Sequence, residues 1–161
     1  MKKAAIVIAC VLCLGIAYVL VSPLWRTVTL EEPSPIAPKP AAEEVVMETN
    51  EPMPASPAVV SQGAFVAKAH DVSGRAMLIR TGDAHVLRFE DFETINGPDV
   101  RVYLSSGLGI EDAIDLGPIR ATKGSVNYEI PAGTDTAKYP HVLVWCRAFR
   151  VLFSEALLQS L

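Results

Sequence analysis

The chain is poor in cysteine, in basic charge and in catalytic signatures, and each shortage argues against a class of function. Only one of its three cysteines, Cys146, lies beyond residue 13. The 18 acidic residues outnumber the 14 basic ones, and this balance argues against a nucleic-acid partner, which normally requires a basic face. The sequence contains neither a G-x-S-x-G nucleophile elbow nor a Gly-rich phosphate loop. Support for a turnover enzyme is therefore thin.

Residues 1–26 predict an N-terminal transmembrane anchor. Residues 4–24 read AAIVIACVLCLGIAYVLVSPL without a charge, and about 20 apolar residues are enough to cross a bilayer as a helix. Lys2 and Lys3 precede this run, which predicts a cytoplasmic N-terminus and an extracytoplasmic C-terminal domain on a cell-membrane protein. The lipid bilayer is thus the predicted partner of residues 4–24.

Two alternatives to an uncleaved anchor fit the sequence less well. The apolar run is longer than the core of an ordinary signal peptide, and Pro23 directly follows a candidate cleavage point near Ser22. A lipoprotein cut before Cys10 would leave too short a leader. Cys10 and Cys13 form a C-x-x-C pair, which is interpreted as two small residues of a membrane helix rather than as a redox motif.

Residues 27–61 predict a disordered, Pro-rich linker. The segment EEPSPIAPKPAAEEVVMETNEPMPASP holds seven prolines and shows no apolar periodicity. Such a composition cannot bury a core and favours an extended chain. The linker would act as a stalk that holds the following domain away from the membrane.

Residues 62–161 predict an all-β domain. Apolar and polar residues alternate over 99–104 and over 126–130, which is typical of strands with one buried face. Gly and Pro interrupt residues 107–124, where we expect a loop, a helical turn near 111–113 and a short strand around Ile119. Many short strands separated by turns predict an antiparallel β-sandwich.

One hairpin can be predicted residue by residue. Gly82-Asp83 has the composition of a two-residue hairpin turn. Counting outward from this turn pairs Leu78 with Leu87 and Ala76 with Phe89. Apolar residues thus meet across the ladder, so the turn and the register agree.

Four stretches of this domain resemble the DM13 family. They are GAFVAKAHDVSGRAMLI (63–79), LRFEDFETINGPDVRVYLS (87–105), DLGPIRATKGSVNYEIP (115–131) and KYPHVLVWCRAFRVLFSEALL (138–158). The resemblance implies a small extracytoplasmic all-β module with a role in electron transfer. The family's hallmark cysteine falls on Cys146, and the resemblance implies that this thiol works in redox chemistry, directly or by holding a prosthetic group such as haem.

The residues themselves leave two interpretations of Cys146 open. In HVLVWCRAF, Val142, Val144, Cys146 and Ala148 would share one strand face, and Leu143, Trp145 and Phe149 the other. Both faces are apolar, so we expect an interior strand in which Cys146 is a buried, inert residue. A redox role instead needs a thiolate, and the nearby Arg147 would point to the opposite face of a regular strand.

The three histidines of the chain are candidate partners of Cys146. His70, at the end of a strand in AHDVSG, is the best candidate, because Cys and His are both axial ligands of haem iron. His85, opposite Arg80 in the hairpin, and His141, at a strand start, are expected on the surface. No pair of histidines has zinc-site spacing, so no metal site is predicted.

An acidic group near EDFETINGPD is interpreted as a solvated loop rather than a cation site. It comprises Glu90, Asp91, Glu93 and Asp99 and lacks the spacing of a calcium loop. Two functional hypotheses remain. The domain is a redox module that uses Cys146, with His70 and haem as candidate partners and an unidentified redox protein as its counterpart, or it is a non-catalytic binding or adhesion module of the cell envelope. Covalent dimerisation through Cys146 is a third alternative.

Overall fold

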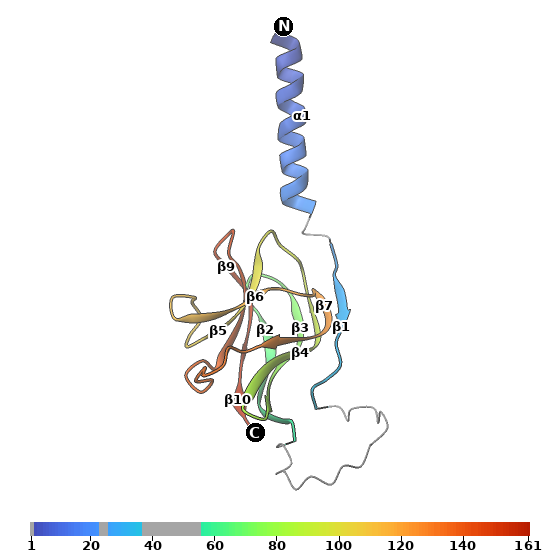
Figure 1. The fold of residues 1–161 in the computed structure, drawn as a ribbon. Coiled ribbons are helices and arrows are strands. Elements are labelled where there is room, and N and C mark those ends of the chain that lie inside the picture. Colours follow the sequence, from blue (N-terminus) through green and yellow to red (C-terminus); the bar gives the residue numbers. More distant parts are fainter. Residues whose placement is uncertain (1, 23–25, 37–55) are drawn as a thin grey trace.

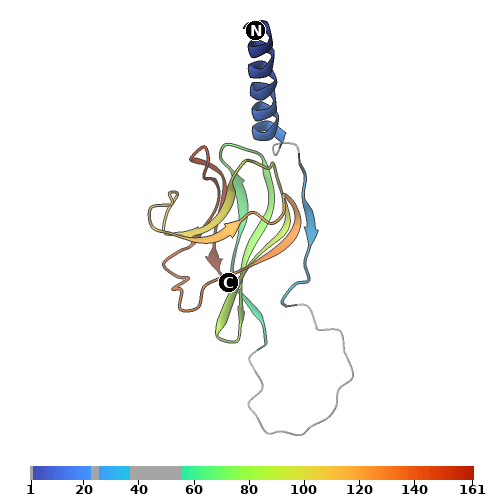
Figure 2. The same cartoon turned by 45° about the horizontal axis from the view of Figure 1, so that its top comes forward.

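The protein consists of one N-terminal helix and a curled β domain in the part of the chain that the structure, a computed structural model, describes: residues 2–22, 26–36 and 56–161. The helix stands away from the sheet in both views (Figures 1 and 2). Its elements are α1 (Lys2–Val21), β1 (Thr29–Glu31), β2 (Ala58–Ala67), β3 (Val72–Thr81), β4 (Ala84–Thr94), β5 (Val100–Ser105), β6 (Ala113–Pro118), β7 (Lys123–Glu129), β8 (His141–Cys146), β9 (Val151–Leu157) and β10 (Gln159–Ser160).

The strands form one continuous sheet rather than two separate layers. Their order is β1-β7-β4-β3-β2-β9-β8-β5-β6, with β10 paired to β2. The first part of β2 pairs with β3, and its last residues, 65–67, pair with β9. One strand thus belongs to both halves of the sheet, which curls into a half-barrel (Figure 1). The all-β prediction is confirmed, whereas the predicted sandwich fits only in part.

The sheet is mixed, because one of its pairs is parallel. β1 runs parallel to β7, with Leu30 opposite Gly124. All other pairs are antiparallel, including the predicted hairpin of β3 and β4. In that hairpin Leu78 faces Leu87 and Ala76 faces Phe89, so the register predicted from the turn at 82–83 is confirmed.

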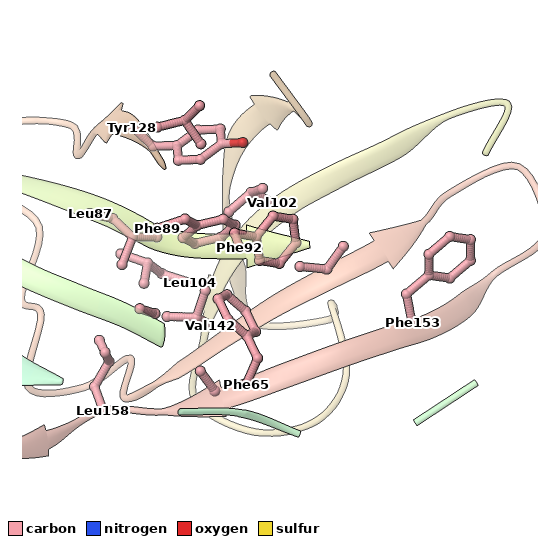
Figure 3. Close-up of a cluster of buried hydrophobic side chains, with 14 of the residues drawn as sticks. Phe65, Leu87, Phe89, Phe92, Val102, Leu104, Tyr128, Val142, Phe153 and Leu158 are labelled. Atoms are coloured by element: carbon pink, nitrogen blue, oxygen red, sulfur yellow. The ribbon is translucent and has the colours of Figure 1, made fainter. Parts of the chain in front are cut away.

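The core fills the concave side of the half-barrel. Its aromatic centre is formed by Phe65, Phe89, Phe92 and Tyr128, whose ring centroids lie 4.8–5.0 Å apart in the contacting pairs. Aliphatic side chains from β5, β8 and β9 pack against these rings from the other half of the sheet (Figure 3). Leu158 and Phe153 lie at opposite ends of this cluster (Figure 3), which gives the core two distinct ends.

Two core aromatics share a face only because β4 is irregular. Phe89 and Phe92 are three residues apart, so a regular strand would point them to opposite sides. The register of β4 against β7 shifts between them, and Asp91 has a left-handed φ of 50°. Gly74 on β3 lies against this bulge: a Cβ there would sit 2.7 Å from the carbonyl oxygens of Glu90 and Asp91. The bulge therefore requires a glycine at position 74.

Part of the predicted linker, residues 27–61, pairs with strands of the β domain. β1 pairs with β7 inside the range 27–61, and β2 begins at Ala58. The Val28 amide donates to the Thr122 hydroxyl at 2.9 Å. Beyond β1, the carbonyl oxygen of Glu32 accepts a hydrogen bond from the buried guanidinium of Arg88 at 3.1 Å. We call residues 26–36 the strap. The remainder of the predicted linker, 37–55, lies outside the described residues.

α1 places apolar side chains in solvent. Val7, Ile8, Leu12, Ile16 and Val19 are each at least 60 % exposed. In the described part of the chain, no helix has both the length and the hydropathy of a membrane span. The predicted transmembrane anchor over residues 4–24 is not confirmed, and residues 23 and 24 of that range lie outside the described chain.

Candidate functional site around Cys146

Cys146 is the last residue of an interior strand and is fully buried. β8 lies between β5 and β9, and Cys146 pairs with Val100 on one side and Val151 on the other. Its exposed fraction is 0 %, and it belongs to the core cluster together with Val142 and Val144. The predicted interior strand is thus confirmed.

The strand ends earlier than the alternation in HVLVWCRAF predicts. Residues 147–150 form a turn, so Ala148 does not continue the face of Cys146. Phe149, predicted on the opposite apolar face, lies in this turn and is 61 % exposed. Arg150 adopts a left-handed φ of 56° at the end of the turn. The thiol therefore lies at the boundary between the core and an exposed turn.

Two hydrogen bonds tie this turn to the loop that precedes β5. The Arg147 amide donates to the Asp99 carbonyl oxygen at 2.8 Å, and the Arg147 guanidinium donates to the Asp99 carboxylate at 2.7 Å. In the same loop, a Cβ on Gly97 would lie 2.9 Å from the side chain of Val100, the ladder partner of Cys146. We call the two Arg147–Asp99 hydrogen bonds the latch, since they hold the turn that follows Cys146 to the loop before β5.

His70 lies at this end of the core but does not reach Cys146. It follows β2 in a bend and is half-buried. Its ring contacts Phe153 edge to face, with the centroids 4.2 Å apart, and its amide donates to the Phe153 carbonyl oxygen at 3.3 Å. No hydrogen bond links His70 to Cys146 among the described residues. The role that this contact supports is packing over Phe153.

The surroundings of Cys146 do not fit the haem that the sequence resemblance implies. A macrocycle bound through sulfur needs an open cavity beside the sulfur atom, whereas Cys146 has no exposed surface and is enclosed by the side chains of its neighbouring strands. Two cavities of the β domain, one at Arg80 and His85 and one at Asp71 and Glu93, are not lined by the thiol. Within the described ranges, no three His, Cys, Asp or Glu residues cluster as metal ligands.

The acidic residues predicted to form a solvated loop are instead distributed among separate ion pairs. Glu90 pairs with Arg75, Glu93 with Lys123 at 2.9 Å, and Asp99 with Arg147 at 2.7 Å. These partners come from β3, β7 and the turn after β8. The group is therefore not one site, and each pair fixes a different part of the surface.

A second charged pair lies next to the latch on the outer face of the sheet. Burial alone would raise the pKa of Asp115, but hydrogen bonds from the Arg101 guanidinium at 2.8 Å and from the Gly117 amide at 2.8 Å hold this pKa below its usual range. Burial also raises the pKa of the nearby Tyr103 phenol. Asp115 therefore stays ionised and keeps β6 attached to β5.

The other two histidines are less exposed than the sequence predicts. His141 is half-buried, with its Nδ1 atom 3.3 Å from the Glu155 carboxylate. His85 is also half-buried and lines a cavity with Arg80, its partner in the hairpin register. The alternation of β4 contained a signal for the position of His85. His85 lies two residues before Leu87, and its partner Arg80 lies two residues after Leu78, so both lie on the same strand face as a core leucine.

Comparison with known proteins covers most of the β domain. A family model described as "Electron transfer DM13" matches residues 64–158. This range includes Cys146 and His70 and leaves out α1 and the strap. No curated protein and no solved structure matches the chain.

Proposed function

The chain belongs to the DM13 family of electron-transfer domains, and from this premise we propose that its β domain exchanges electrons with a partner protein through Cys146. One observation carries the proposal. Cys146 is the only cysteine in the matched residues 64–158, and it lies at the end of a strand, directly before the latch residue Arg147. The thiol itself would be the redox group, because its surroundings do not fit a haem.

A single thiol restricts the chemistry to an exchange between molecules. With no second cysteine in the domain, Cys146 cannot store electrons as an internal disulfide. The thiol loses its proton to solvent, and the thiolate sulfur attacks one sulfur of a disulfide in the partner. A new S–S bond forms, and the partner's other sulfur leaves as a thiolate. The partner is therefore a protein with a reducible disulfide.

The exchange requires the latch to open. A thiol with no exposed surface cannot meet a partner's disulfide, so the turn 147–150 has to move away from the loop at Asp99. Segments at strand ends open at a lower free energy than the centre of a core. The latch would thus gate Cys146 and limit its reaction to partners that favour the open form.

The test measures how fast Cys146 reacts in the folded chain. Cys10 and Cys13 are exposed free thiols, so both are first replaced by alanine in the full-length protein. The reaction of Cys146 with an aromatic disulfide reagent is then followed in native buffer. Replacing Asp99 by Asn weakens a partly exposed ion pair worth up to about 1 kcal/mol, so the reaction should be roughly fivefold faster. Glu93→Gln, which disrupts an exposed pair with Lys123 outside the latch, is the matched control and should leave the rate unchanged.

The full burial of Cys146 favours a second candidate function, a non-catalytic binding module of the cell envelope. In this alternative the cysteine is a core residue only. It predicts that the thiol reacts only when the whole domain unfolds, and that Asp99→Asn changes the rate no more than its effect on global stability requires. That result would exclude electron transfer through Cys146.

We further propose that residues 4–24 attach the protein to a lipid bilayer, with the N-terminus in the cytoplasm and the β domain outside. The charge-free apolar run, the preceding Lys2 and Lys3, and the exposed apolar side chains of α1 support this placement. Membranes from cells that express the full chain should retain it after alkaline carbonate washing. Release into the wash would contradict the attachment.

A further inference from the structure

The end of the core opposite Cys146 holds a cavity of about 350 Å³. Leu78 and Leu158 form its apolar floor, and Ala137 and Pro140 from the loop before β8 form one wall. Leu158 lies at the far end of the core from Phe153 (Figure 3), whereas Cys146 pairs with Val151, two residues from Phe153. The cavity is therefore separate from the site around the thiol.

The positive charge of this cavity follows from the alternation of the hairpin. Arg80 pairs with His85, and each lies two residues from a core leucine, Leu78 or Leu87, on the same face of its strand. The core face of β3 and β4 thus ends in a guanidinium and an imidazole instead of further apolar side chains. Arg80 makes no ion pair or hydrogen bond with any residue that the structure describes.

Hydroxyl groups complete the polar rim. Ser61, Thr136 and Ser160 line the cavity with Arg80 and His85, and in the described part of the chain none of these five side chains donates or accepts a hydrogen bond. Ser61 is only 8 % exposed, and its hydroxyl makes no hydrogen bond with a described residue. This hydroxyl is therefore free to pair with a group inside the cavity.

The lining contains no carboxylate. Asp83 in the hairpin turn and Asp135 in the loop are close in sequence, but neither lines the cavity. A guanidinium, an imidazole that donates from one ring nitrogen, and three hydroxyls therefore face the same space. This set favours an anion at the rim, and the leucine floor favours an apolar group beneath it.

We propose that this cavity binds a small amphiphilic anion, a carboxylate attached to a short apolar chain. The carboxylate accepts hydrogen bonds from Arg80, which suits a planar, two-oxygen acceptor, and from the hydroxyls of the rim. The apolar chain lies against Leu78 and Leu158. The volume is at the lower end of ligand pockets, which restricts the occupant to a small molecule.

The first experiment compares two probes of the same shape. Hexanoate and its neutral counterpart hexanamide are titrated into the full-length chain labelled with ¹⁵N, and binding is read from the amide shifts of the β3–β4 hairpin and residues 136–140. A ligand of this size should bind with a dissociation constant of about 1 mM. Hexanamide should bind at least tenfold more weakly, because it lacks the negative charge that strengthens the hydrogen bonds from Arg80.

Two variants locate the binding. Arg80→Met keeps the apolar stem and removes the charge, so hexanoate should bind at least tenfold more weakly. Arg75→Met removes the same charge from the same strand, where Arg75 is already paired with Glu90, and should bind like the wild type. Thr136→Trp fills the cavity from the loop without changing its charge and should abolish binding even if Arg80→Met does not fold.

Each outcome decides the proposal. Equal binding of hexanoate and hexanamide, equal weakening by Arg80→Met and Arg75→Met, or unchanged binding by Thr136→Trp would overturn it, as would the absence of binding by either probe. A short peptide with a free C-terminal carboxylate is tested beside its amidated form. If the free peptide binds more tightly than hexanoate, the cavity recognises a chain terminus and the small-molecule assignment is wrong.

Discussion

Removing the Glu32 side chain should destabilise the β domain, although the sequence predicts that Glu32 lies in a disordered linker. The Glu32 carboxylate accepts a hydrogen bond from the backbone amide of Asn127 at 2.7 Å and pairs with the Arg120 guanidinium. It thereby holds the strap against β7. Glu32→Ala leaves the half-buried Asn127 amide without this partner.

The size of the effect follows from these two interactions. A hydrogen bond between an amide and a carboxylate contributes about 1.5–3 kcal/mol, and the pair with Arg120, which is half exposed, adds less than about 1 kcal/mol. Glu32→Ala should therefore lower the free energy of unfolding by about 2 kcal/mol. For a domain of this size the midpoint temperature should fall by roughly 8 °C.

Urea unfolding of the full-length chain, followed by tryptophan fluorescence, measures this change. Glu31→Ala is the matched control, because the neighbouring Glu31 is exposed and its side chain makes no hydrogen bond or ion pair among the described residues. The control should cost less than about 0.5 kcal/mol. If both variants lose the same small amount, the strap does not stabilise the domain.

Two other changes test the core. Burial raises the pKa of Tyr128 to about 12, so the folded chain keeps this proton between about pH 10 and 12 while the unfolded chain loses it. The contribution of the Tyr128 phenol to the free energy of unfolding is complete below pH 10 and is lost as the pH rises through 12, by about 2–3 kcal/mol. In urea unfolding, Tyr128→Phe should lack this part of the decline in stability. Gly63→Ala should cost more than about 2 kcal/mol in the same assay, because its Cβ would overlap the carbonyl oxygen of Leu157 on β9; a neutral result would contradict the close pairing of β2 and β9.

Local sequence signals predicted the parts of the fold that local chemistry decides. The turn at 82–83 fixes the register of β3 and β4, and the left-handed φ of 63° at Gly82 agrees with the turn residues. The alternation over 99–104 likewise predicted β5. In these segments, the turn type and the period of two determine which residues face the core, and neither depends on a distant partner.

The strap and the bulge could not be predicted in the same way. β1 lies in a Pro-rich segment, and its stabilising partners, Thr122 and Asn127, are more than 90 residues away. Phe89 and Phe92 break the period of two, so a sequence pattern cannot show that both face the core. The bulge at Asp91, for which Gly74 leaves room, puts both rings on the same side.

The candidate site shows the same division. The apolar run HVLVWC predicted an interior strand, but the Asp99 partner of Arg147 lies 48 residues away and gives no sequence signal. Arg80 and His85 were predicted to be paired in the hairpin. Their position over a cavity depends on Ser160 and the loop at Thr136, which only the folded sheet brings to them.

The position of Cys146 at a strand end makes its accessibility measurable without a reagent. The Arg147 amide donates to Asp99 directly after the thiol, whereas Leu143 lies in the middle of β8 between β5 and β9. If the latch opens separately from the domain, hydrogen exchange at the Arg147 amide should occur at a lower free energy than at Leu143, which should require global unfolding. Asp99→Asn should speed hydrogen exchange at the Arg147 amide. Exchange at the Leu143 amide should still occur at the free energy of global unfolding. If Arg147 is protected as strongly as Leu143, the thiol becomes accessible only when the whole domain unfolds, and Cys146 cannot transfer electrons in the folded protein.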